Sequence, residues 1–119
     1  MHELSVCQSL LSQVEDIAGE NSAQRVLLVV LGVGPLSGVE PELLKQAYPI
    51  AAAGSVAEGS ELAIESRPVR VACSKCGCES DASSNRLVCS HCGNWQTRLV
   101  SGDELLLLRI EFEREESYV

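Results

Sequence analysis

The spacing of apolar positions divides the first part of the chain into two helices and a strand. Over residues 3–18, apolar residues recur at steps of three and four, which is typical of an amphipathic helix. Residues 26–33 are a continuous aliphatic run rich in β-branched side chains, which indicates a buried strand. Residues 41–53 then predict a second helix with proline at its first position, and Pro49 is expected to kink or shorten it.

Two more strands are predicted further along the chain. Residues 61–71 read as one strand, and Pro68 indicates an edge position or a strand end. Residues 104–113 alternate between apolar and charged side chains, which is the pattern of a strand with one buried face. The apolar members, expected to point the same way, are Leu106, Leu108, Ile110 and Phe112.

These elements predict an α+β protein with an inserted module. A stable sheet face needs about three strands, and neither side of the cysteine-rich segment 72–99 supplies three by itself. The last strand is therefore expected to return to the sheet begun earlier. The prediction is a small three-stranded sheet with two helices, formed by residues 1–71 plus 100–119, into which a zinc ribbon of residues 72–99 is inserted.

Composition narrows the class of protein. The 119 residues include only four aromatic side chains, so one modest core must be mostly aliphatic. The formal net charge of −8 disfavours nucleic acid as a partner, because an acidic surface repels phosphate. Residues 70–99 differ, with four basic and two acidic side chains.

Two Cys-x-x-Cys pairs, twelve residues apart, carry the strongest chemical signal. The expected ligands are Cys73, Cys76, Cys89 and Cys92. Four thiolates close the tetrahedral shell that Zn²⁺ prefers in structural sites, and iron in a four-cysteine site is the rival. Gly77 and Gly93 each follow a pair, where a knuckle turn needs positive φ. The pattern predicts a structural zinc site without an open catalytic position.

The remaining candidate residues have simpler interpretations. Cys7 lies on the apolar stripe of the first helix and is expected in the core. Cys78 is expected to be a spare thiol and His91 to point outward, while Trp95 is expected to pack within the small zinc module.

The sequence also bears on compartment. The first residues lack a basic region followed by an apolar run, and no apolar stretch is long enough to span a membrane. Thiols in unsecreted proteins stay reduced, which favours metal binding over disulfides. We expect a cytoplasmic protein.

A second metal site is expected at residues Met1, His2 and Glu3. The Met1 amine, the His2 amide nitrogen and the His2 Nδ1 can bind one ion in fused chelate rings, and Glu3 can add a fourth donor. Such a nitrogen-rich planar set suits Ni²⁺ or Cu²⁺. Binding requires a neutral imidazole, so affinity should fall as the pH drops through the imidazole range.

The whole chain resembles the HypA/HybF family of nickel metallochaperones. The resemblance rests on residues 1–5 (MHELS), 34–39 (GPLSGV) and 57–62 (AEGSEL), on the two Cys-x-x-Cys pairs, and on residues 107–111 of the last strand. It implies that His2 binds nickel with the backbones of Met1 and Glu3, and that the four paired cysteines hold structural Zn²⁺. It also implies transport of Ni²⁺ to the large subunit of nickel-iron hydrogenase, together with a GTPase partner; some members serve urease.

The leading hypothesis is thus a nickel carrier that is not an enzyme, with neither nucleic acid nor membrane as a partner. No nucleophile–base set and no phosphate-binding glycine loop is recognisable. One alternative is a zinc-ribbon adaptor that binds protein or nucleic acid through residues 73–98, and another is a thiol redox protein that uses Cys7, Cys76 or Cys78. A homodimer and an exchange of the module between protomers stay open.

Overall fold

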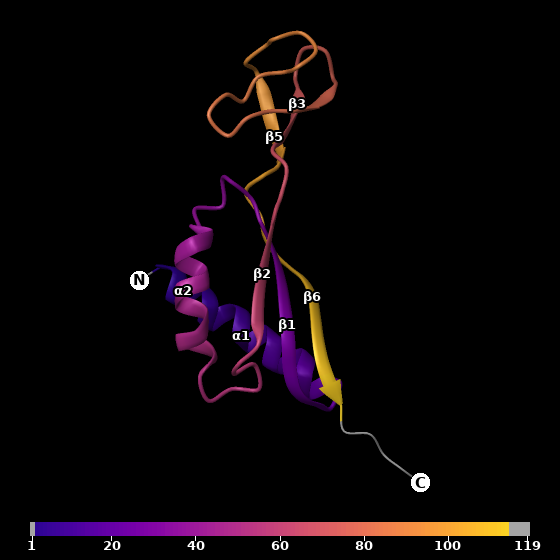
Figure 1. Cartoon of the computed structure of the whole chain (residues 1–119). Coiled ribbons are helices and arrows are strands. Elements are labelled where there is room, and N and C mark those ends of the chain that lie inside the picture. Colours follow the sequence, from indigo (N-terminus) through magenta and orange to yellow (C-terminus); the bar gives the residue numbers. More distant parts are fainter. Residues whose placement is uncertain (1, 115–119) are drawn as a thin grey trace. The chain divides into compact units, whose positions relative to one another are not determined.

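The computed structural model describes residues 2–114, which contain two helices and six strands (Figure 1). The helices are α1 (His2–Glu20) and α2 (Pro41–Ala52), and the strands are β1 (Ala23–Val33), β2 (Glu61–Ser66), β3 (Arg70–Cys73), β4 (Glu79–Asp81), β5 (Thr97–Ser101) and β6 (Leu105–Arg114). The strands form two sheets, with the orders β2-β1-β6 and β4-β3-β5. The α+β class is confirmed, and β6 returns to the sheet of β1 and β2 as predicted.

The described residues divide into two compact units. The helical unit comprises residues 2–31, 39–64 and 107–114, and the cysteine unit comprises residues 32–38 and 65–106. The cysteine unit is therefore wider than the predicted module 72–99. It includes β3, β4 and β5, which form a sheet of their own.

The turn at residues 32–38 belongs to the cysteine unit because its backbone is bonded there. The amide of Gly34 donates to the carbonyl of Glu104 at 2.9 Å, and the amide of Leu36 donates to the carbonyl of Gly102 at 2.7 Å. A Cβ at Gly34 would overlap the Gly102 carbonyl group, so only glycine permits this approach. The close approach explains the glycine that opens the GPLSGV segment.

The two helices pack against each other and supply much of the helical unit's core. Buried positions on α1 follow the predicted helical spacing and are Cys7, Leu10, Leu11, Val14 and Ala18. In α2 the helix continues three residues past Pro49, so the expected shortening there is wrong. Proline removes one backbone donor, and the buried Tyr48 and Ala52 on either side keep the last turn in place.

Two strand predictions need correction. The strand expected over residues 61–71 is two strands, because Pro68 interrupts it and β3 pairs instead with β4 and β5. In β6, Leu106 and Leu108 are 41% and 39% exposed, although both were expected on a buried face. β6 is an edge strand of a sheet with only three strands, so part of its apolar side has no cover.

Candidate metal centre

Two backbone turns of the same geometry present the paired cysteines. In the first, the amide of Gly77 donates to the carbonyl of Cys73 at 3.1 Å, and the amide of Cys73 donates to the carbonyl of Cys78 at 2.9 Å. The second turn repeats both bonds sixteen residues later. The amide of Gly93 donates to the carbonyl of Cys89 at 2.9 Å, and the amide of Cys89 donates to the carbonyl of Asn94 at 3.0 Å. Gly77 and Gly93 both have a φ of +76°, which confirms the predicted need for glycine.

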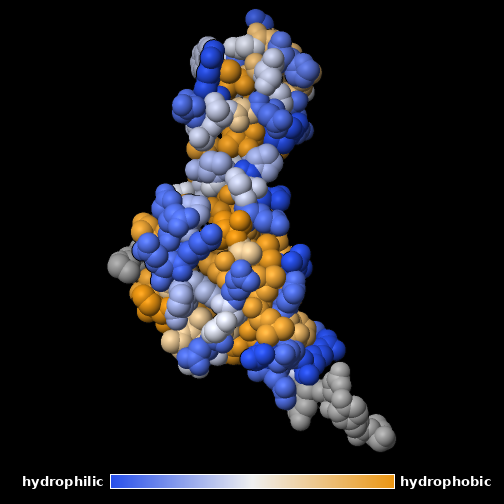
Figure 2. Space-filling view, viewed as in Figure 1, coloured by the Kyte–Doolittle hydropathy of each residue, from blue (hydrophilic) through white to orange (hydrophobic). Residues whose placement is uncertain are grey.

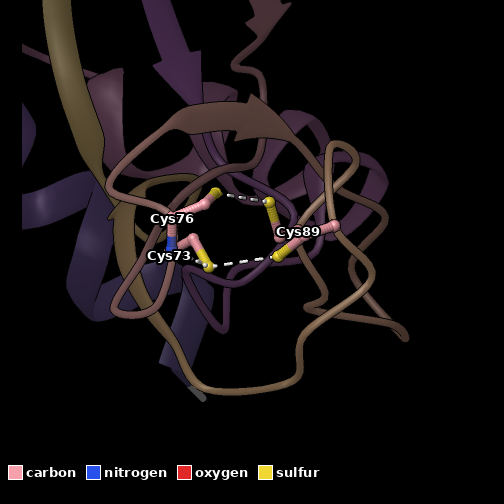
Figure 3. A group of neighbouring side chains, drawn as sticks. Cys73, Cys76 and Cys89 are labelled. Atoms are coloured by element: carbon pink, nitrogen blue, oxygen red, sulfur yellow. Dashed lines mark hydrogen bonds between the residues drawn. The ribbon is translucent and has the colours of Figure 1, made fainter.

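The turns bring four sulfurs into one cluster (Figure 3). The Sγ atoms of Cys73 and Cys92 lie 3.6 Å apart, as do those of Cys76 and Cys89, and all four lie within 4.8 Å of one another. The amides of Lys75 and Cys76 each donate to the Cys73 sulfur at 3.4 Å. The first cysteine of each pair is buried and the second is exposed. The structure therefore brings together the four cysteines that the sequence singles out.

Ionisation within the cluster is uneven. A hydrogen bond from the backbone amide of Cys76 is the main cause that lowers the pKa of Cys73. A hydrogen bond from the backbone amide of Cys92 is the main cause that lowers the pKa of Cys89 to about 6. For Cys76 the amide of Cys78 lowers the pKa, but the neighbouring Cys89 sulfur and burial outweigh it and raise the pKa to about 12. Four thiolates this close repel one another, so full ionisation requires a cation among them.

The donor set fits Zn²⁺. Four thiolate sulfurs from two turns match the closed shell of a structural zinc site, and amides that donate to sulfur stabilise the ionised ligands. The residues that would hold the ion are Cys73, Cys76, Cys89 and Cys92. Such an ion would join β3 to the loop between β4 and β5 and so stabilise a unit with a small core.

Zinc binding at pH 7 should release protons from this cluster. The raised pKa values of Cys76 and Cys92 keep these two thiols protonated without metal, whereas the lowered pKa of Cys89 leaves it ionised. We expect release of at least two protons per zinc, those of Cys76 and Cys92, since metal ligands must be deprotonated. Calorimetric titration of the metal-free protein in buffers of different ionisation enthalpy measures this number, and release of none would contradict the assignment.

The residues beside the cluster take other roles. Cys78 closes its turn through its carbonyl, and its exposed sulfur lies outside the cluster. His91 is exposed, as predicted. Trp95 is 75% exposed, so its expected role in the module's core is wrong; the knuckle backbone holds the turn without it. Cys7 is fully buried, and burial raises the pKa of its thiol, which does not favour a redox role.

The expected nickel ligands lie at the start of α1, mostly outside the described part. Met1 lies outside the described residues, and so does the side chain of His2, whose backbone opens α1. Glu3 is half-buried, and its Oε2 accepts a long hydrogen bond, at 3.5 Å, from the amide of Glu40. Sequence reasoning missed Leu43 and Ile50 beside Glu3, because an apolar residue in a helix is ordinarily assigned to the core.

The fold and the cluster define a small α+β metalloprotein with a four-cysteine zinc-ribbon site. Residues 1–112 match the family model "Hydrogenase/urease nickel incorporation, metallochaperone, hypA". The chain therefore belongs to the HypA family of nickel-incorporation metallochaperones, whose members act in hydrogenase maturation.

Individual relatives cover nearly the whole chain. A "Hydrogenase maturation factor HypA" of Nitrosospira multiformis is 50% identical over 93% of this chain and 96% of its own length. The Aquifex aeolicus protein of the same description is 42% identical over 95% of this chain and 98% of its own length. The solution structure of the "Ni metallochaperone HypA from Helicobacter pylori" matches with a TM-score of 0.71 and 27% identity, covering 95% of this chain and 98% of that one. A second structure, titled "Solution structure of HypA protein", matches with a TM-score of 0.75 and 29% identity, and the match covers 97% of this chain and 98% of that one.

One further finding concerns membranes. Among the helices within residues 2–114, none is long and apolar enough to cross a bilayer.

Proposed function

We propose that the chain carries Ni²⁺ at its N-terminus and delivers it to the large subunit of nickel-iron hydrogenase. The observation that carries this proposal is the match of residues 1–112 to a nickel-incorporation family, which includes the Met1-His2-Glu3 start. The chain acts as a carrier and not as an enzyme, in the cytoplasm and with a GTPase as its partner in insertion. The cysteine unit holds Zn²⁺ and does not take part in the transfer as a ligand.

The position of His2 in the fold supports a chelate at this end. The first four amides of an α-helix have no acceptor within the helix, and α1 begins at His2. The amide nitrogens of His2 and Glu3 are therefore not used in the helical ladder, which suits them as metal donors. A ligand set at a helix start can also exchange its donors one at a time, as transfer requires.

A cell that lacks this protein should lose most hydrogenase activity at limiting nickel. The wild-type chain should restore it, and His2→Ala should not, because the large subunit would stay without nickel. Hydrogenase activity and the nickel content of the purified large subunit measure the outcome. Restoration by His2→Ala equal to the wild type would contradict nickel carriage at the N-terminus. His91→Ala, which changes the chain's other histidine, is the matched control.

A further inference from the structure

An apolar groove lies on the surface of the helical unit beside the first turn of α1. Its cavity of about 320 Å³ is lined by Leu43, Gln46, Ala47 and Ile50 of α2 and by Glu3 of α1. Leu43 is 47% exposed and Ile50 is 67% exposed. In Figure 2, hydrophobic side chains gather on the outer side of α2. The groove is not explained by the metal site or by the core.

The apolar face of α2 is wider than its contact with α1 requires. The side chains buried in the core are Leu44, Ala47, Tyr48 and Ala52. Leu43 and Ile50 lie one further step around the helix, seven residues apart and therefore two turns apart along one line. Polar residues at these two positions would leave the core unchanged. Together with Ala47 they form the stripe by which helices recognise other helices.

The charged residues near this groove are mostly acidic. Of the acidic side chains of α1, Glu3 lies in the first turn and lines the groove, whereas Glu15, Asp16 and Glu20 lie toward the other end of the helix. Glu40 precedes α2 and Glu42 lies in its first turn, whereas Lys45 is the single basic residue of that helix. Glu3 lines the groove itself, and its carboxylate lies 3.5 Å from the amide of Glu40. An acidic rim around an apolar floor favours an occupant that is apolar on one side and basic along its edges.

We propose that this groove docks an amphipathic helix with basic flanks, supplied by the protein that exchanges nickel with the N-terminus. Apolar side chains of that helix contact Leu43, Ala47 and Ile50, and its lysines or arginines face Glu3, Glu40 and Glu42. The choice of partner rests on the proposed nickel carriage, because Glu3 belongs both to the groove and to the proposed chelate. Docking there holds the partner next to the ion during transfer.

The docking can be tested without nickel. The probe is a synthetic peptide of about 18 residues, with leucines spaced three and four apart and lysines on the remaining face, long enough to be helical when bound. Titration into ¹⁵N-labelled protein should shift the amide signals of residues 43–48 and of Ile50, and leave those of the cysteine unit unchanged. Ile50→Glu should weaken binding roughly tenfold or more, as loss of a central apolar anchor does. Leu27→Glu, at a site 39% exposed on β1 and outside the groove lining, should leave affinity within about twofold.

Three results would overturn the proposal. These are equal binding of a peptide with glutamate in place of lysine, equal affinity of Ile50→Glu, and a change in sedimentation of the free protein on Ile50→Glu, which would make a second copy of this chain the occupant. Titration of Ni²⁺ alone into the same variants separates the two ideas. If Ile50→Glu binds both Ni²⁺ and the lysine peptide with wild-type affinity, only the proposed docking surface is wrong. If the wild type binds the peptide but not Ni²⁺, the proposed carriage fails, and with it the choice of partner.

Discussion

Replacing Cys89 by serine is expected to release zinc and unfold the cysteine unit. Cys89 is 2% exposed, and its sulfur is one of the four that form the cluster. A bound structural zinc contributes on the order of 10 kcal/mol in small zinc domains, which is comparable to the whole stability of a typical domain. Losing one thiolate removes most of that contribution. Zinc content and the ¹H–¹⁵N spectrum of residues 65–106 measure the effect.

Cys78→Ser is the matched control for this prediction. Its sulfur lies outside the cluster, and its role in the knuckle belongs to its backbone carbonyl, which serine keeps. This variant should retain one zinc and a dispersed spectrum. A folded Cys89→Ser protein with a full complement of zinc would show that the four sulfurs are not the site. Loss of zinc from the control would show that Cys78 is a ligand.

Replacing His2 by alanine is expected to lower the affinity for Ni²⁺ by at least roughly 100-fold, since even altered outer-shell partners cost 10–100-fold. A single residue placed before Met1 should have a similar effect, because it converts the amine donor into an amide. Wild-type affinity should fall as the pH drops through the imidazole range, because binding requires a neutral imidazole. Titration of Ni²⁺ into protein with Met1 as its first residue measures all three.

His91→Ala controls for the loss of any histidine. His91 is exposed and lies between two proposed zinc ligands, so its removal should leave nickel affinity unchanged. If the two variants bind Ni²⁺ equally well, the proposed chelate at Met1-His2-Glu3 is wrong. A pH-independent affinity between pH 5.5 and about 7.5 would argue equally against an imidazole donor.

Local spacing was sufficient to predict the helices and the four-cysteine cluster. The stripe of α1 and the repeated Cys-x-x-Cys-Gly both encode structure within a few residues, so each could be recognised without knowledge of the rest of the fold. The GPLSGV segment also marked its turn. Its place in the cysteine unit could not be predicted, because the bonds from Gly34 and Leu36 reach residues about seventy positions away.

Exposure was harder to predict than secondary structure. Alternation in β6 predicts which side chains share a face, but not whether anything covers that face, and Leu106 and Leu108 are partly exposed. The same limit explains Trp95 and the groove residue Ile50. An apolar side chain on a functional surface looks like a core residue in sequence, since both follow the same periodicity.

The sheet order β2-β1-β6 has a consequence for how the chain folds as it is made. The central strand β1 can pair with β6, its second neighbour, only when β6 has been synthesised. By then every cysteine of the zinc cluster has already been made. A ribosome making this chain at about 5–20 residues per second completes the zinc ligands first. Ion capture by the nascent chain can thus precede closure of the sheet beside α1. Zinc supply during translation is therefore expected to affect the yield of the folded helical unit, even though the four zinc-binding cysteines lie in the other unit.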